Sequence, residues 1–184
     1  MQIEPARLDG VVTFVPQPHH DDRGWFTRTF DAEIFDRWRG VPGAAAAFLQ
    51  DSQSRSARGV LRGLHGRRDP GEAKLVRCAH GAVHDVLVDA RPQSPTFGRH
   101  EVFLLDDVTC RHLYVPPGML HGFQALSEIA DVCYRIDRIH DPADDLAVSW
   151  QDPDLAIDWP LHPPTLSARD ASAGSWADLL TRIR

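Results

Sequence analysis

The sequence predicts an all-β domain, either a sandwich or a barrel, because turn signals recur along it at short intervals. Between these turns lie short segments in which side chains alternate in character. In residues 130–136, for example, Val132, Tyr134 and Ile136 share one face of the expected strand, and the residues between them share the other. The chain has 184 residues, no internal repeat and no shift in composition, so we expect a single domain over residues 1–184.

The strands are predicted from apolar, β-branched or aromatic runs that end at turn residues. A polar turn at 19–24 and an alanine-rich loop at 42–47 separate the first of them. Pro116-Pro117-Gly118 ends another, because proline cannot continue a strand ladder. Strands are expected over 11–15, 25–30, 48–54, 59–65, 73–79, 82–89, 98–105, 111–115, 121–126 and 130–136.

Two short helices are expected at the periphery. Phe30, Ile34 and Trp38 recur every four residues, which indicates one amphipathic helix that ends near Gly40. Residues 175–183 are interpreted as a terminal helix.

Composition limits the classes of function. The net charge of -6 argues against a nucleic-acid partner, which would favour a basic face. Cys78, Cys110 and Cys133 are scattered and form no CxxC pair, so they are interpreted as reduced thiols of a cytoplasmic protein. No apolar run approaches the length of about 18 residues that a membrane span needs, and the first residues do not resemble a secretory signal.

Charged side chains are concentrated in two of the expected strands. Arg62 and His65 lie among apolar residues in the stretch GVLRGLH at 59–65, and Lys74 opens the next strand. Burying charged groups without partners is costly. Such a cluster therefore predicts a lined pocket that binds an anion and moves a proton.

These strands also carry a resemblance to a known family. Residues 21–26 match its D-x-R-G-x-F segment, and residues 59–65 match its G-V-L-R-G-L-H strand. Further matching blocks follow in the same order along the chain at 73–77, 94–98, 116–123, 152–160 and 166–170. The sequence thus resembles the nucleotide-sugar epimerases typified by dTDP-4-dehydrorhamnose 3,5-epimerase.

The resemblance implies a fold and an activity. The implied fold is a cupin-type jelly roll, or double-stranded β-helix, assembled as a homodimer without a metal or organic cofactor. The implied activity is that of an isomerase that epimerises a dTDP-linked 4-keto-6-deoxyhexose at C3, C5 or both. Such a reaction serves the biosynthesis of deoxysugars, either rhamnose or the sugars of secondary metabolites.

The resemblance also assigns catalytic roles. His65 is the expected base, since the unperturbed pKa of histidine lies near the working pH. Asp170 would orient His65 and stabilise its protonated form. Lys74 would stabilise the enolate oxygen. Tyr134 would return a proton from the opposite face of the sugar.

A second group of residues is implied in substrate binding. Arg23 and Arg62 are the expected diphosphate clamps, because guanidinium groups match phosphate geometry and stay charged. Phe26, Gln50 and His121 would also line the site.

Two alternatives stay open. A metal-dependent cupin enzyme would need His and carboxylate ligands that converge on one ion, but His65-Gly66-Arg67 lacks the second histidine of the usual His-x-His pair. A non-catalytic module would bind the sugar nucleotide without exchanging its hydrogens.

The sequence departs from the family at four positions. Gly66 replaces an aromatic residue, commonly tyrosine, and is expected to remove a large side chain near the reacting centre. Ser52 replaces an asparagine, and Ile139 and His140 replace tyrosines that help to hold the nucleotide base. These departures leave open which nucleotide sugar is bound and which carbon is inverted.

Overall fold

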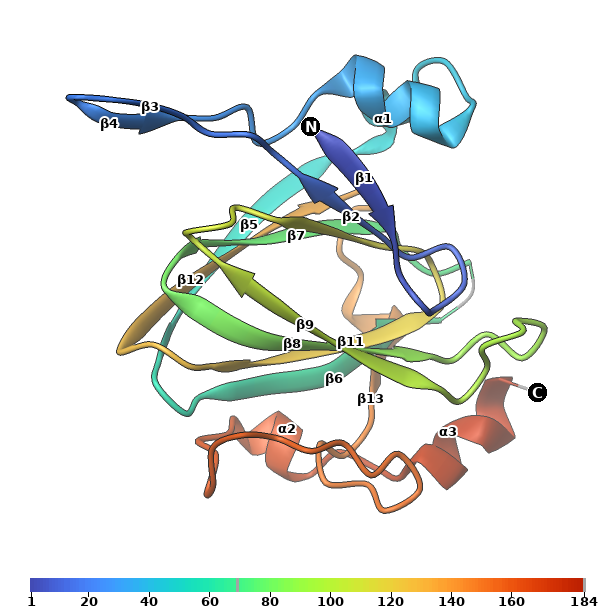
Figure 1. Cartoon of the computed structure of the whole chain (residues 1–184). Coiled ribbons are helices and arrows are strands. Elements are labelled where there is room, and N and C mark those ends of the chain that lie inside the picture. Colours follow the sequence, from blue (N-terminus) through green and yellow to red (C-terminus); the bar gives the residue numbers. More distant parts are fainter. Residues whose placement is uncertain (69, 184) are drawn as a thin grey trace.

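Two antiparallel β-sheets face one another across the main hydrophobic core (Figure 1). The computed structural model describes residues 1–68 and 70–183. The six-stranded sheet has the order β1 (Gln2–Pro5), β2 (Val12–Val15), β10 (His112–Val115), β7 (Lys74–His80), β12 (Ile129–Ile136) and β5 (Gln50–Ala57). The five-stranded sheet has the order β13 (Asp145–Ala147), β6 (Leu61–Arg67), β11 (Met119–Ala125), β8 (Ala82–Asp89) and β9 (His100–Asp106).

The core fills the space between the sheets because strand residues alternate in the direction they face. Val132 packs in this core with Val76 from the same sheet and with Leu87 and Phe123 from the opposite sheet. Tyr134 packs against the same cluster. The predicted all-β jelly roll and the predicted face of 130–136 are therefore confirmed.

The N-terminal helix also forms as predicted. Helix α1 (Ala32–Arg39) begins at the N-cap Asp31 and ends at Gly40, which has φ 67° and donates its backbone N–H to the last turn. Phe35 of α1 packs with Phe14 and Tyr114 on the outer face of the six-stranded sheet. The alanine-rich loop contains a 3₁₀ turn, η1 (Ala44–Ala47).

One predicted element was wrong. Residues 19–24 were expected to be a polar turn and 25–30 a strand, but β3 (His19–Asp21) and β4 (Gly24–Phe26) form a separate two-stranded hairpin. This hairpin projects beyond the sheets (Figure 1). The strand β3 was missed because His19, His20 and Asp21 are all polar, which in the sequence resembles a turn.

The C-terminal segment covers the outer face of the five-stranded sheet (Figure 1). It includes η2 (Pro142–Asp144), α2 (Ala168–Ala171) and α3 (Trp176–Ile183), the last of which confirms the predicted terminal helix. Trp159 and Trp176 are buried there against Leu64 and Val86. This packing lays α2 beneath β6. None of the described helices is long and apolar enough to cross a membrane.

A close crossing of backbones shapes β6 beside His65. The register of β6 and β11 shifts between His121 and Phe123. A Cβ added at Gly63, which has φ 133°, would lie 2.4 Å from the Cα of Gly122. Glycine at 63 therefore permits this irregular pairing.

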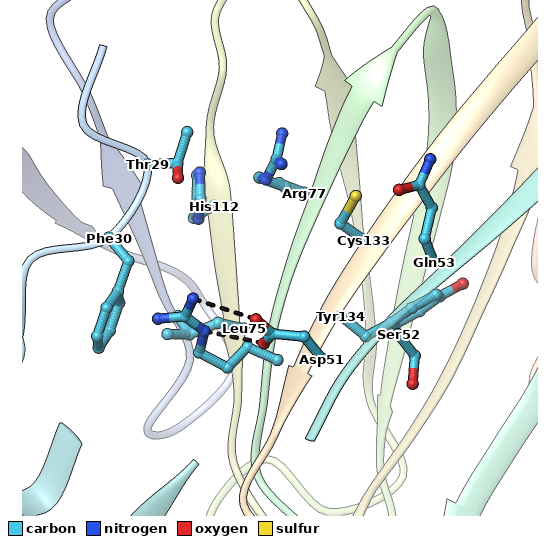
Figure 2. Close-up of a pocket in the computed structure, with 11 residues that line it drawn as sticks. Thr29, Phe30, Asp51, Ser52, Gln53, Leu75, Arg77, His112, Cys133 and Tyr134 are labelled. Carbon is cyan, nitrogen blue, oxygen red and sulfur yellow. Dashed lines mark hydrogen bonds and ion pairs between the residues drawn. The ribbon is translucent and has the colours of Figure 1, made fainter. Parts of the chain in front are cut away.

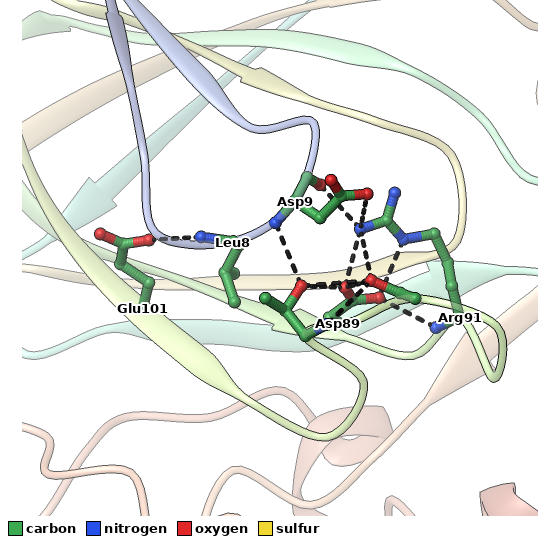
Figure 3. Close-up of polar contacts among 7 residues, drawn as sticks. Leu8, Asp9, Asp89, Arg91 and Glu101 are labelled. Atoms are coloured by element: carbon green, nitrogen blue, oxygen red, sulfur yellow. Dashed lines mark hydrogen bonds and ion pairs between the residues drawn. The ribbon is translucent and has the colours of Figure 1, made fainter.

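A buried carboxylate ties the loop after β8 to the N-terminal strands (Figure 3). Asp89 accepts hydrogen bonds from Arg91 Nη2 at 2.7 Å, Ser94 Oγ at 2.5 Å and Thr96 Oγ1 at 2.6 Å. Arg91 also donates to the carbonyl of Asp9 at 2.7 Å. Burial alone would raise the pKa of Asp89, but these hydrogen bonds outweigh burial and hold its pKa below 3.8.

We predict that Asp89→Asn lowers the free energy of unfolding by about 2–3 kcal/mol at neutral pH, because the amide cannot accept all of these bonds. The loss should shrink as the pH falls through the lowered pKa of Asp89, since protonation then removes the charge from the unsubstituted protein too. Urea unfolding between pH 7 and pH 3 measures both effects. Asp22→Asn, on the exposed hairpin, is the control. A constant difference across this range would contradict the assignment.

Candidate functional site

A cavity of ≈ 580 Å³ opens between the two sheets. Its walls come from both sheets and from the segment that leads into α2. It is lined by Ser54, Val60, Leu61, Arg62, His65, Lys74, His121, Phe123, Tyr134, Ile136, Thr165, Leu166, Ser167, Arg169 and Asp170. Six residues predicted from the sequence thus meet in one place, namely Arg62, His65, Lys74, His121, Tyr134 and Asp170.

His65 and Asp170 form a short hydrogen bond. His65 Nε2 lies 2.6 Å from Asp170 Oδ1, although 105 positions separate the two residues in the chain. Asp170 is 4% exposed and sits in the first turn of α2, whose N-cap Ser167 accepts from the Asp170 backbone N–H at 3.1 Å. The carboxylate is therefore held against the imidazole by both the packing and the cap of α2.

The surroundings of His65 keep its imidazole neutral. Burial lowers its pKa below 6.5, and the positive charges of Arg169 and Lys74 act in the same direction. Asp170 opposes them without reversing the shift. A neutral imidazole bonded to a carboxylate is equipped to accept a proton and to be stabilised once it carries one.

Tyr134 lies on the opposite sheet from His65, on β12 rather than β6. Its hydroxyl shares a hydrogen bond of 3.2 Å with Ser54 Oγ. Burial raises the pKa of Tyr134, so the phenol carries its proton at neutral pH. A proton acceptor and a proton donor therefore reach one cavity from two different sheets.

Lys74 adds a positive charge on the same sheet as Tyr134. It opens β7, its side chain is 13% exposed, and its Nζ lies 2.9 Å from Glu72 Oε1. An ammonium in so sheltered a place interacts strongly with a developing negative charge.

Arg62 and His121 complete the wall of the cavity. Arg62 donates from Nε to Ser56 Oγ at 3.1 Å, and its side chain is exposed at the rim. His121 lies opposite His65 in the pairing of β11 with β6, and its Nε2 lies 2.7 Å from Asp85 Oδ2. Asp85 was missed in the sequence because it lies in an apolar run, where a lone aspartate gives no sign of its partner.

Three predicted binding residues lie outside this cavity. The side chain of Arg23 is 89% exposed on the hairpin and pairs with Asp21 at 2.5 Å, and Phe26 on the same hairpin is 72% exposed. Gln50 accepts from the backbone N–H of His140 at 2.9 Å at the start of β5. A single chain does not bring these residues to the others.

The departure at Gly66 proves to lie on the other face of β6. Gly66 lines a separate hollow with Met119 and Leu146, and an added Cβ would lie 2.8 Å from Leu120 Cδ2. The expectation that glycine here empties space at the reacting centre was therefore wrong, because alternate strand residues face opposite ways.

The departures at Ile139 and His140 are not among the residues that line the cavity that holds His65. Ile139 is 73% exposed, and His140 Nε2 lies 3.5 Å from Asp145. Ser52 pairs with Tyr134 between β5 and β12, so its side chain lies on the same face of the six-stranded sheet as Tyr134. It also borders a second hollow, of ≈ 340 Å³, on the outer face of that sheet (Figure 2). That hollow also contains His112, whose pKa burial lowers to about 3.

No cluster of three or more His, Cys, Asp or Glu side chains suited to a metal ion occurs in residues 1–68 and 70–183. His65 and His121 each contact a carboxylate of their own instead.

Comparison with known proteins yields one family. The sequence model of the dTDP-4-dehydrorhamnose 3,5-epimerase family matches residues 5–178. The chain is 41% identical over 179 residues to the dTDP-4-dehydrorhamnose 3,5-epimerase of Pseudomonas aeruginosa, which covers 97% of each chain.

Two solved structures extend this similarity to the fold. A 4-keto-6-deoxy sugar epimerase from the novobiocin gene cluster of Streptomyces spheroides superposes with a TM-score of 0.93 at 40% identity, covering 99% of this chain and 90% of that one. The epimerase of Legionella pneumophila, solved with dTDP-4-keto-L-rhamnose, gives 0.91 at 36% identity, covering 99% and 96%.

We predict that Asp170→Asn lowers the pKa of His65 further, because it removes the carboxylate that opposes burial. Titration of the histidine ring signals by NMR measures this pKa, and His65→Asn identifies the signal. A rise in the pKa of His65, or no change, would contradict the assigned pairing.

Proposed function

Because the chain belongs to the dTDP-4-dehydrorhamnose 3,5-epimerase family, we propose that His65 and Tyr134 are the two proton-transfer residues of its reaction. The protein is an isomerase that epimerises a dTDP-linked 4-keto-6-deoxyhexose in deoxysugar biosynthesis. The observation that carries the assignment is a neutral imidazole, bonded to Asp170, across one cavity from a protonated phenol.

The chemistry follows from the ketone at C4 of the sugar. His65 takes the proton from C3 or C5, and the electrons of the broken C–H bond move onto the ketone oxygen to give an enolate. Tyr134 then donates its proton to the same carbon from the other face, and solvent restores both residues. The product differs from the substrate only in configuration.

Two charged groups lower the energy of this path. The imidazolium that forms at His65 lies 2.6 Å from the carboxylate of Asp170. Lys74 stabilises the enolate oxygen, a contribution of about 3–4 kcal/mol by analogy with an oxyanion-hole donor. Lys74 can stabilise the enolate formed at C3 and the enolate formed at C5, since both carbanions place their charge on the ketone oxygen at C4.

Arg62 and His121 bind the substrate within the same chain. The guanidinium of Arg62 at the rim suits a diphosphate, and His121 lines the cavity beside Tyr134, with ring centroids 6.2 Å apart. We assign no metal or organic cofactor, because enolisation beside a ketone needs only a base, an acid and a fixed positive charge.

A homodimer would use the residues that lie outside the cavity. The hairpin exposes Trp25 (52%) and Phe26 (72%), and an isolated two-stranded hairpin is marginally stable in water. We infer that the hairpin of one subunit covers the cavity of the other and that Arg23 contacts the diphosphate there. Gln50, the first residue of β5, would lie at the margin of this contact.

We further place the protein in the cytoplasm. Its three cysteines, Cys78, Cys110 and Cys133, are free thiols, as is usual in a reducing compartment.

One prediction of the proposed function concerns the base. His65→Asn should abolish the exchange of sugar hydrogens for solvent deuterium in dTDP-4-keto-6-deoxyglucose, followed by NMR in heavy water, while dTDP still binds. His100→Asn, an exposed histidine on β9, is the control and should exchange at the unsubstituted rate. Exchange by His65→Asn at that rate would remove His65 as the base.

Another prediction concerns the acid. Tyr134→Phe should slow inversion more than it slows proton removal, because only the reprotonating step loses its donor. The comparison needs deuterium exchange and product formation measured in the same sample. If the two rates fall equally, or neither falls, Tyr134 is not the opposing acid.

A further prediction concerns the proposed dimer. Arg23→Ala and His65→Asn should each be nearly inactive alone, yet a mixture of the two should regain activity. About a quarter of all sites would then combine an intact Arg23 from one subunit with an intact His65 from the other. A mixture no more active than the mean of its parents would contradict the exchange of hairpins.

A further inference from the structure

The ammonium of Lys74 is held by one oxygen of a buried carboxylate. Lys74 Nζ lies 2.9 Å from Glu72 Oε1, and the Glu72 side chain is only 8% exposed. Glu72 lies two positions before Lys74, in the segment that leads into β7, and the two side chains meet there. Lys74 lines the cavity with His65, whereas Glu72 lies behind it and lines a different hollow.

The second oxygen of Glu72 is bound as well. Arg67 donates from Nε to Glu72 Oε2 at 3.1 Å, and its side chain is 10% exposed. Arg67 Nη1 lies 2.7 Å from Asp145 Oδ1 and also donates to the carbonyl of Asp141. Glu72 therefore cannot turn toward or away from Lys74 without breaking a second charged contact.

This set of contacts continues to the other side of the cavity. Asp145 Oδ2 lies 2.8 Å from Arg169 Nη1, and Arg169 directly precedes Asp170 in α2. Charges of alternating sign thus lead from Lys74 through Glu72, Arg67 and Asp145 to Arg169. They connect the cation of the site with the helix that carries the partner of His65.

A flexible lysine needs such a partner to act on one oxygen atom. Its side chain has many rotamers, and an unpaired ammonium in a sheltered site is costly. Stabilisation of an enolate depends on a charge already in place, and a displacement of about 1 Å can cost a hundredfold in rate.

We propose that Glu72 is a positioning residue of the epimerisation: it fixes Lys74 Nζ at the place where the C4 oxygen becomes an enolate. This inference rests on the proposed role of Lys74. Glu72 is not among the residues that line the cavity, and its direct link to the site is its contact with Lys74 Nζ.

The test measures deuterium exchange into dTDP-4-keto-6-deoxyglucose at saturating substrate for Glu72→Ala and Glu72→Gln. Glu72→Ala should slow exchange by about tenfold or more, since a displaced cation no longer meets the oxygen. The exchange rate should fall by the same factor at C3 and at C5, because both carbanions place their charge on the same C4 oxygen. Glu72→Gln keeps one acceptor for Lys74 and should fall between Glu72→Ala and the unsubstituted protein.

Matched controls separate positioning from general stability. Glu101→Gln removes the charge of another buried carboxylate, which accepts hydrogen bonds from Arg7 and from the backbone N–H of Leu8. Figure 3 shows the contact with Leu8. This substitution should lower stability without changing the exchange rate of the folded protein. The dissociation constant for dTDP should change by less than about twofold in the Glu72 variants, because the proposed role of Glu72 concerns the enolate and not the binding of the nucleotide.

A double substitution tests whether the effect of Glu72 requires Lys74. In the Lys74→Ala background, Glu72→Ala should cause no further loss, because its effect requires the ammonium. The proposal is overturned if Glu72→Ala and Glu72→Gln exchange as fast as the unsubstituted protein, or if the two losses multiply in the double variant. Absence of exchange in the unsubstituted protein would instead refute the proposed function, so the two failures are distinct.

Discussion

The contact between His65 and Asp170 is the constraint on which the site depends. It joins a strand of the five-stranded sheet to a helix 105 residues later in the chain. Asp170 reaches His65 only because the C-terminal segment is anchored on the outer face of that sheet by Trp159 and Trp176. The large apolar contact of the last forty or so residues thus fixes the position of one carboxylate, and the carboxylate fixes the imidazole.

Each of the two sheets of the jelly roll supplies part of the proposed chemistry. The five-stranded sheet supplies His65 and His121, and the six-stranded sheet supplies Lys74 and Tyr134. Burial acts on the two proton carriers in opposite senses, lowering the pKa of His65 and raising that of Tyr134. It thereby favours the neutral form of each, which is the form in which one accepts and the other donates.

Sequence reasoning succeeded where residues lie in strands with strong local patterns. The β-rich fold, the helix ending at Gly40 and the convergence of His65 with Lys74 were all predicted, the last through the family resemblance. Contacts that depend on tertiary packing were not. The pairing of Glu72 with Lys74 depends on how the chain enters β7, and the face of β6 on which Gly66 lies depends on the course of that strand. Every residue in the two strands of the projecting hairpin is exposed, so no alternation between buried and exposed positions marks these strands in the sequence.

The isotope content of the first product formed in heavy water tests opposite-face proton transfer most directly. If His65 removes hydrogen from one face and Tyr134 supplies it from the other, every inverted carbon should carry deuterium from the first turnover. Product that keeps its original hydrogen at an inverted carbon would show that one residue both removes and returns the proton. That result would contradict the division of roles between the two sheets.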